Sequence, residues 1–188
     1  MARRRSDDKR SAILSAATRV IAVQGLSAPT AMIAKEAEVS NGSLFTYFET
    51  KADLMNQLYI ELKAEMAAAS LDGLSTEGDF REQMRRMWIH WLRWATSCPD
   101  KRRTLAHLSV SADITPASLE TGHRTMAGVA KLLEQSRENG PLRDAPLGFV
   151  VALMNAMADA TIDFMIRDPA HADEHAAAAF EALWRVVT

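Results

Sequence analysis

Apolar residues recur along this chain at the three- and four-residue spacing of amphipathic helices, interrupted by Gly, Pro, Asp and Ser. Alternating apolar and polar runs of β-branched residues, which are typical of strands, do not occur. The pattern predicts an all-α protein with helices over about 7–24, 30–37, 41–48, 52–71, 78–97, 101–111, 116–139, 147–167 and 169–187. Gly25 is expected to end the first helix, and Asp168 with Pro169 to begin the last.

The segment 30–51 is predicted to hold two helices that are too short to be stable on their own. The apolar positions that would pack them together are Ile33, Ala34, Ala37, Leu44 and Phe48. Small alanines let two helices cross closely at the steep angle of a helix-turn-helix. We therefore expect a helix-turn-helix over about 30–48 within a three-helix N-terminal domain, residues 1–51.

The outward positions of the second short helix carry hydrogen-bonding or flat side chains and no carboxylate. They are Asn41, Gly42, Ser43, Phe45, Thr46 and Tyr47. Such side chains suit contact with base edges and phosphates of DNA. Thr30 is expected to cap the first short helix, and Lys51 stands where a further phosphate contact is expected.

The charge is distributed unevenly between the two ends of the chain. Residues 1–51 contain eight Lys/Arg and five Asp/Glu, whereas the remainder contains 14 and 19. A basic N-terminal region joined to an acidic remainder is the charge asymmetry that binding to a polyanion would need. The single cysteine, Cys98, fits a reducing compartment, and no secretory signal or membrane-spanning run is recognised, so we expect a cytoplasmic protein without a membrane partner.

Residues of about 10–60 resemble the DNA-binding domain of the tetracycline-repressor (TetR) family. The resemblance rests on R-x2-I-L-x-A-A, then G-L-S-A-P-T, then I-A-x-x-A-E-V-S-N-G-S-L-F-T-Y-F-E-T-K-A-D-L. It implies a homodimeric regulator, usually a repressor, that binds a palindromic DNA operator and is released by a small molecule held in the C-terminal domain. The positions that this resemblance assigns to DNA contact are Thr30, Asn41, Ser43, Phe45, Thr46, Tyr47 and Lys51.

Two residues depart from the family pattern. Glu38 occupies the turn position where glycine is usual, and a left-handed backbone there costs a non-glycine residue about 1–2 kcal/mol. Phe45 replaces the usual tyrosine and removes a hydroxyl that would bind phosphate. Both substitutions bear on the strength and sequence preference of DNA binding.

Residues 52–188 are expected to form a larger helical domain that senses a ligand and dimerises. Methionine and aromatic side chains along its helices predict an adaptable interior for an apolar or amphipathic small molecule, although the same stripes are typical of an ordinary core. The predicted pocket residues are Met84, Trp88, Trp91, His107, Met126, Met154 and Met157. No cofactor is expected.

The last two helices are long, apolar and rich in alanine on more than one face, which indicates burial on more than one side. Pairing with the same helices of a second chain would make a four-helix bundle. The residues predicted for this dimer interface are Phe180, Leu183, Trp184 and Val187. If the chain is monomeric, these positions belong to its own core.

The sequence gives little support for metal binding or for catalysis. His171 and His175 are spaced for two metal ligands on one helix face, but no third ligand converges with them, so no metal is predicted. A Gly-rich phosphate loop, a nucleophile elbow and a paired catalytic carboxylate motif are missing, which argues against an enzyme. Two alternatives stay open: a helical enzyme or lipid- or other small-molecule-binding protein without a DNA role, and an adaptor whose helix-turn-helix is vestigial.

Overall fold

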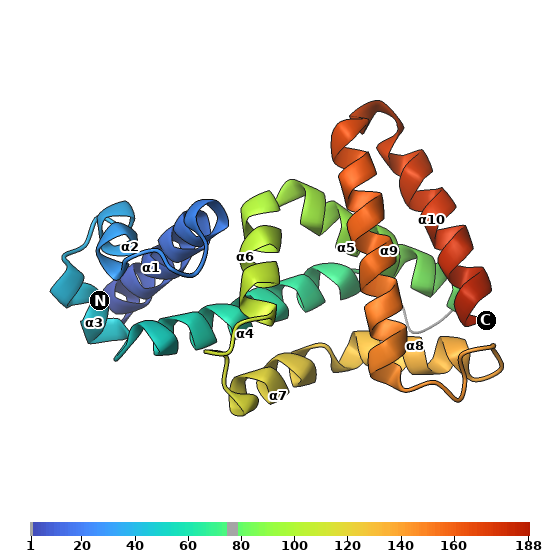
Figure 1. Cartoon of the computed structure of the whole chain (residues 1–188), viewed down its shortest axis with the longest axis horizontal. Helices are drawn as coiled ribbons and strands as arrows, with labels where there is room; N and C mark the ends of the chain where they lie inside the picture. Colours follow the sequence, from blue (N-terminus) through green and yellow to red (C-terminus); the bar gives the residue numbers. More distant parts are fainter. Residues whose placement is uncertain (1, 75–78) are drawn as a thin grey trace. The chain divides into compact units, whose positions relative to one another are not determined.

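The computed structural model describes residues 2–74 and 79–188, with side chains from residue 7 onward, and contains no β-strand within these ranges (Figure 1). The helices are α1 (Ala2–Gln24), α2 (Thr30–Glu36), α3 (Asn41–Tyr47), α4 (Lys51–Leu71), α5 (Phe80–Ser97), α6 (Pro99–Ser109), α7 (Pro116–Thr125), α8 (Ala127–Arg137), α9 (Leu147–Arg167), the 3-10 helix η1 (Pro169–His171) and α10 (Ala172–Val187). The predicted all-α class is confirmed. The predicted start of the fifth helix at residue 78 lies outside the described residues.

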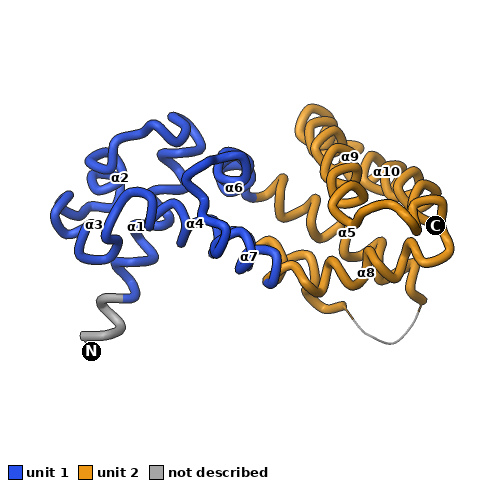
Figure 2. Tube along the Cα trace, turned by 60° about the horizontal axis from the view of Figure 1, so that its bottom comes forward, with its two compact units in different colours: residues 1–64, 98–124 blue, residues 65–97, 125–188 orange. Residues whose placement is uncertain are grey.

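The chain divides into two compact units (Figure 2). Unit 1 comprises Met1–Ala64 and Cys98–Arg124, and unit 2 comprises Glu65–Ser97 and Thr125–Thr188. The helix α4 therefore begins in unit 1 and ends in unit 2. This division differs from the predicted boundary between residues 51 and 52, because α6 and α7 pack with the N-terminal helices.

Unit 1 is held together by buried polar contacts between distant segments as well as by apolar packing. Thr104 on α6 donates its hydroxyl to the Thr18 carbonyl of α1 at 2.8 Å. On α4, the Asn56 amide donates to the Asp113 carbonyl and accepts from the Thr115 N–H, both at 2.8 Å. Because each of these pairs satisfies buried polar groups, α6 and α7 are fixed to the helices that carry the helix-turn-helix.

The first helix behaves largely as its pattern predicts. Ile13, Ala17 and Ile21 of α1 are fully buried, while Gln24, which was placed on the same stripe, is exposed. Gly25 ends the helix with a φ of +73°, and its N–H donates to the Ile21 carbonyl at 2.8 Å. A left-handed residue at this position is where glycine is favoured, so the predicted stop is confirmed.

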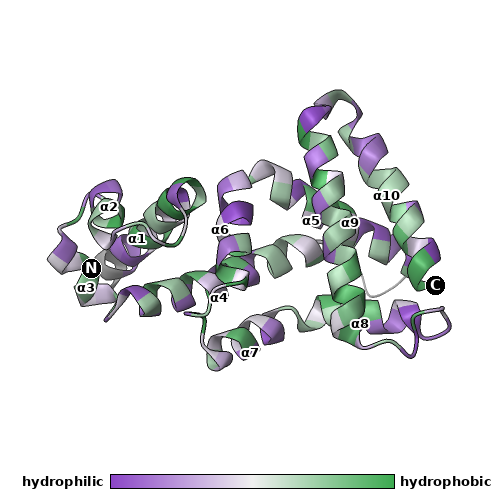
Figure 3. Ribbon diagram, viewed as in Figure 1, coloured by the Kyte–Doolittle hydropathy of each residue, from purple (hydrophilic) through white to green (hydrophobic). Residues whose placement is uncertain are grey.

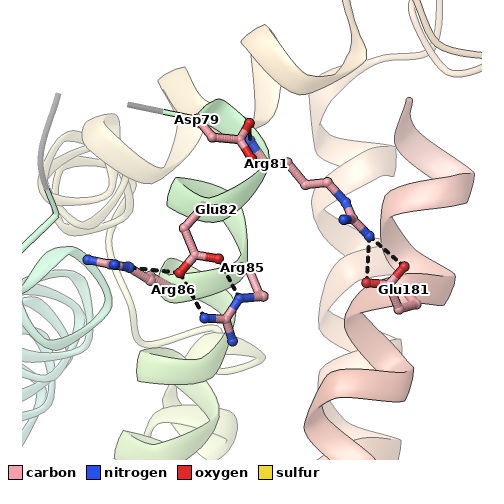
Figure 4. Close-up of polar contacts among 6 residues, drawn as sticks. All are labelled: Asp79, Arg81, Glu82, Arg85, Arg86 and Glu181. Atoms are coloured by element: carbon pink, nitrogen blue, oxygen red, sulfur yellow. Dashed lines mark hydrogen bonds and ion pairs between the residues drawn. The ribbon is translucent and has the colours of Figure 1, made fainter. Parts of the chain in front are cut away.

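In unit 2, the helices α5, α9 and α10 pack around a core of large apolar side chains. Trp88 of α5 is fully buried, and its indole N–H donates to the Ala176 carbonyl of α10 at 3.1 Å. At the surface, Arg81 of α5 makes a bidentate ion pair with Glu181 of α10, with both N–O distances 2.6 Å (Figure 4). These contacts join α5 to α10 at the core and at its rim.

Nearby on α5, Glu82 accepts hydrogen bonds from two arginines of its own helix (Figure 4). The hydrogen bonds from Arg85 and then Arg86 lower the pKa of Glu82 to about 2. The carboxylate therefore stays charged at any pH near neutrality.

Two predictions about the C-terminal helices were wrong in detail. The helix expected over 116–139 is broken at Met126, whose φ of −88° and ψ of 4° separate α7 from α8. Glycines at positions 122 and 128 flank the break and weaken the helix on both sides. Asp168 makes no side-chain cap hydrogen bond, because its carboxylate faces two histidine rings, and a 3-10 turn precedes α10.

The helix α9 is long and apolar enough to pass a composition test for a membrane span, with a mean hydropathy of 1.6 over an 18-residue window. The apolar runs of the sequence predict no such helix. One third of that window, 33%, is buried inside the chain, and the first half of α9 is strongly hydrophobic (Figure 3). The side of α9 that faces away from α10 and α5 exposes apolar residues together with Asn155, Asp159 and Asp163.

The segment between α8 and α9 is docked on the C-terminal end of α10 through Gly140. A Cβ on Gly140 would lie 1.9 Å from the Val187 carbonyl oxygen, which belongs to the backbone and has no room to move aside. The Arg137 guanidinium fixes the same segment by donating to the carbonyls of Leu142, Arg143 and Ala145. Gly140 is therefore required by close packing.

We predict that Gly140→Ala lowers the free energy of unfolding by about 1–3 kcal/mol, because the added methyl forces the backbone apart. The matched control is Gly148→Ala, since a Cβ at Gly148 in α9 would meet nothing within 4 Å. That change should raise the free energy of unfolding by up to about 1 kcal/mol through helix propensity. Urea unfolding at one fixed protein concentration measures the free energy of unfolding of both variants. Equal changes in the two variants would contradict the close packing of Gly140 against the end of α10.

Candidate DNA-binding surface

The turn between α2 and α3 is closed by two backbone hydrogen bonds. The Val39 N–H donates to the Ala34 carbonyl at 2.9 Å, and the Glu38 N–H donates to the Lys35 carbonyl at 3.1 Å. This pair of bonds requires a left-handed residue after the helix. Glu38 supplies it with a φ of 55°, the single positive φ of a non-glycine residue within residues 2–74 and 79–188, which confirms the predicted strain.

The helix α3 is anchored by its buried face and by an N-terminal cap. Leu44 and Phe48 are fully buried, as their four-residue spacing predicted. The Ser40 hydroxyl accepts the Ser43 N–H at 3.0 Å and so caps the helix. Ser40 was missed as a cap in the sequence, although serine directly before a helical segment is a recognised signal.

The predicted contact residues of α3 share one outward face. Asn41, Phe45 and Thr46 are exposed, with Phe45 40% exposed, whereas Ser43 and Tyr47 are half-buried. The Thr46 hydroxyl donates to the Gly42 carbonyl at 3.3 Å within the helix, which leaves its lone pairs available to a ligand. The structure thus brings these five predicted positions together on one accessible surface.

The other two predicted contacts occupy the starts of neighbouring helices. Thr30 is the first residue of α2 and does not cap it, because Pro29 takes the extended backbone of the cap position, with φ −66° and ψ 142°. Lys51 begins α4, and its ammonium donates to the Leu26 carbonyl at 2.6 Å. An ammonium has three donors, so Lys51 retains capacity for a phosphate while it fixes the loop before α2.

Two arginines of α1 hold the short helices and were not singled out as positioning residues in the sequence. The Arg10 guanidinium lies 5.6 Å from the centroid of the Phe48 ring and donates to Gln57 Oε1 of α4 at 2.5 Å. Arg19 forms an exposed ion pair with Glu36 of α2 at 2.7 Å. Their partners lie 17 to 47 residues away along the chain, so spacing along one helix gave no signal.

The predicted pocket residues separate between the two units. Met84, Trp88, Trp91, Met126, Met154 and Met157 belong to unit 2, whereas His107 is an exposed residue of α6 in unit 1. The assignment of these residues to one pocket stays a prediction. Trp88 and Trp91 meet edge to face with centroids 5.7 Å apart, and Met84 is fully buried. The Nδ1 atom of His90, on the same helix, is buried without a hydrogen-bond partner among the described residues.

The residues predicted for the dimer interface lie inside unit 2. Phe180, Leu183 and Val187 are at most 2% exposed in the single chain, and Trp184 is half-buried against Phe80 and Phe180. Phe180, Leu183 and Val187 are covered by the chain's own core, so assigning these three to a dimer interface was wrong, whereas the assignment of Trp184 stays a prediction. The apolar face left exposed is instead on α9, where Phe149 is 52% and Phe164 is 55% exposed.

The two histidines considered as metal ligands turn toward one carboxylate. His171 Nδ1 and His175 Nε2 lie 3.0 Å and 3.1 Å from Asp168 Oδ2. The hydrogen bond with Asp168 raises the pKa of His171, and the two histidine contacts lower the pKa of Asp168. Hydrogen bonds to Asp168 account for the placement of both histidines at the turn between α9 and α10.

Comparisons with known proteins agree with the geometry of the helix-turn-helix. Residues 13–58, which contain α2 and α3, match the model of the family described as bacterial regulatory proteins, tetR family. The solved structure of a TetR family transcription regulator from Marinobacter aquaeolei VT8 superposes with a TM-score of 0.87 at 27% identity, covering 98% of each chain. Residues 13–58 therefore carry a DNA-binding domain of the TetR type, and the whole chain has the fold of a TetR family regulator.

Other TetR-like proteins support this assignment. A putative tetR family regulator from Shewanella sp. PV-4 has a TM-score of 0.82 and 27% identity, covering 94% of this chain and 96% of that one. An uncharacterized HTH-type transcriptional regulator, YhgD of Bacillus subtilis (strain 168), is 30% identical over 82 residues, 43% of either chain. These relatives are named as regulators, which agrees with the expectation that the chain is not an enzyme.

We predict that Glu38→Gly raises the free energy of unfolding by roughly 0.5–1 kcal/mol. Relief of the left-handed strain contributes about 1–2 kcal/mol, and the greater freedom of glycine in the unfolded chain offsets part of it. Glu38→Ala is the control, because it removes the charge and retains the Cβ. Thermal unfolding compares the two variants. If Glu38→Ala stabilises the protein as much as Glu38→Gly does, the gain does not come from relief of backbone strain.

Proposed function

We propose that this protein is a sequence-specific DNA-binding transcription regulator that acts in the cytoplasm as a homodimeric, ligand-released repressor. The observation that carries the proposal is the exposed face of α3, which presents Asn41, Phe45 and Thr46 without a carboxylate on a helix fixed by buried Leu44 and Phe48. A helix presented in this way fits the major groove of DNA.

The part of the proposal that concerns a releasing ligand rests on unit 2. Unit 2 contains the methionine and tryptophan side chains suited to an apolar or amphipathic effector. Because α4 begins beside α3 and continues into unit 2, a ligand that shifts the end of α4 acts directly on the helix that supports α3. Coupling of this kind is reciprocal, so bound DNA weakens the ligand by the same factor.

The DNA proposal is tested on a duplex that the protein selects from random sequences. Thr46→Ala should weaken binding to the selected duplex by a factor of roughly 5–150, with little effect on a random duplex, since a contact near base edges is lost. Lys51→Ala should weaken both duplexes alike and reduce the slope of log affinity against log salt by about one unit. Fluorescence anisotropy at several salt concentrations measures both.

Two controls separate these effects from misfolding. Lys131 is an exposed lysine of α8, and Lys131→Ala should leave affinity and salt slope unchanged. Lys51→Gln keeps an N–H donor for the Leu26 carbonyl while removing the charge. If folded Thr46 and Lys51 variants bind as the parent does, α3 is not the DNA-contacting helix.

The homodimer is expected to form through the outer face of α9. Its exposed small and aromatic residues follow one helical stripe: Phe149, Ala152, Ala156, Ala160 and Phe164. Alanines at the middle of the stripe let two copies of α9 approach closely, and the phenylalanines at its ends supply apolar area. This surface keeps the first of the two helices predicted from the sequence to pair and differs from that prediction in the residues that make the contact.

We predict that Ala156→Arg converts the dimer into a folded monomer, because the charge lies at the centre of the stripe. Ala106→Arg, on the exposed surface of α6, is the matched control and should leave the dimer intact. Sedimentation velocity at micromolar concentration measures the mass, and circular dichroism checks the fold. A parent protein that sediments as a monomer, or an Ala156→Arg variant that remains dimeric, would contradict the interface.

A further inference from the structure

The exposed face of α3 carries one large apolar side chain, Phe45. Its side chain is 40% exposed, and the other exposed residues of this helix are Asn41, Gly42 and Thr46. Among residues 2–74 and 79–188, no second aromatic ring and no cation packs on the Phe45 ring. The chain therefore leaves this ring free to contact another molecule, in the middle of a face that is otherwise polar or without a side chain.

Gly42 lies one turn before Phe45 on the same helix. Positive φ values among the described glycines occur at Gly25 and Gly73, so the backbone at Gly42 is one that alanine also adopts. A Cβ added to Gly42 would meet nothing within 4 Å, so internal packing does not require glycine here either. Glycine nevertheless weakens a helix of seven residues relative to alanine. Close approach of a ligand to the backbone is a further reason for glycine, and Gly42 leaves room for it beside Phe45.

The major groove of DNA restricts what a phenyl ring can contact. A helix with its side chains is about 10–12 Å across and the groove is about 12 Å wide, so the contacting face meets the base edges closely. A phenyl ring has no donor for a phosphate oxygen. Against a base N–H or carbonyl it would displace water without replacing the hydrogen bond, which costs free energy. The apolar group on the base edges of this groove is the 5-methyl group of thymine.

We propose that Phe45 determines part of the DNA sequence preference by contacting the 5-methyl group of a thymine in the major groove, and that Gly42 lets the backbone of α3 come close enough for this contact. The proposal rests on the proposed function in taking α3 as the DNA-contacting helix, and it names the chemical group that one residue of this helix recognises. In a homodimer the contact occurs once in each half-site.

The test uses the full chain and the selected duplex, with each thymine replaced in turn by deoxyuridine, which lacks only the methyl group. At one thymine of each half-site, this replacement should raise Kd about fourfold, the factor that burial of one such group supplies. Replacement in both half-sites should raise Kd roughly 15-fold. Fluorescence anisotropy at one fixed salt concentration measures these values.

Variants of Phe45 connect the methyl group to this side chain. Phe45→Ala should bind the selected duplex more weakly than the parent does, and it should bind the thymine and deoxyuridine duplexes equally at the sensitive position. Phe45→Leu should retain the preference for thymine, because leucine is also apolar. Val110 at the end of α6 is 86% exposed and serves as the control, since Val110→Ala should keep the affinity and the thymine preference of the parent.

Gly42→Ala tests the close approach of the backbone. The added methyl group meets nothing in the free chain and favours the helix, so it should raise the midpoint of thermal unfolding. The same group would lie between α3 and the base edges, so Kd for the selected duplex should rise by a factor of roughly 5–150, as for overpacking of a close contact. A purely structural role of Gly42 would not increase stability and decrease affinity together.

The outcomes separate this contact from the proposed function. If the parent selects a duplex but no deoxyuridine replacement changes its affinity, or if Phe45→Ala keeps the thymine preference, the methyl contact is overturned while DNA binding stands. A selected half-site without thymine overturns it as well. Gly42→Ala binding as tightly as the parent would overturn the close approach at Gly42. A parent protein that selects no duplex would refute the proposed function, and the methyl contact with it.

Discussion

The surface that would meet DNA depends on the burial of Leu44 and Phe48 beneath α3. Seven residues make too few backbone hydrogen bonds to hold a helix in water, so packing must fix both α2 and α3. Phe48 is the central contact, because it is fully buried and the Arg10 guanidinium covers its ring while bonding to Gln57 of α4. The orientation of the exposed residues of α3 is thereby set by α1 and α4.

The packing that sets the orientation of α3 involves more than the N-terminal helices. Unit 1 includes α6 and α7, which Thr104 and Asn56 fix to α1 and α4 through buried hydrogen bonds. The helix α4 begins beside α3 in unit 1 and continues without a break into unit 2. A ligand that shifts the end of α4 and a DNA duplex on α3 would act on one helix, which is the physical basis for coupling between them.

Much of the helix-turn-helix could be predicted from local sequence. The short helices 30–37 and 41–48 were predicted to within a residue, because their apolar spacing, Gly25 and the strained Glu38 are local signals. The inward and outward faces of α9 and α10 could not be predicted, since alanine and large apolar residues occur on several stripes of both helices. Phe180 was therefore assigned to a dimer although it is in the core. The contacts of Arg10 and Thr104 join segments far apart in the chain, and periodicity carries no information about them.

The most direct test of DNA recognition is a hydroxyl-radical footprint of the unmodified protein on its selected duplex. A dimer that presents two copies of α3 to successive major grooves should protect two half-sites about 10 base pairs, or a multiple of one helical turn, apart. The protection should be symmetric about the centre of the site and should weaken as salt increases. A single protected segment without a symmetric partner, or protection that does not depend on sequence, would contradict the account.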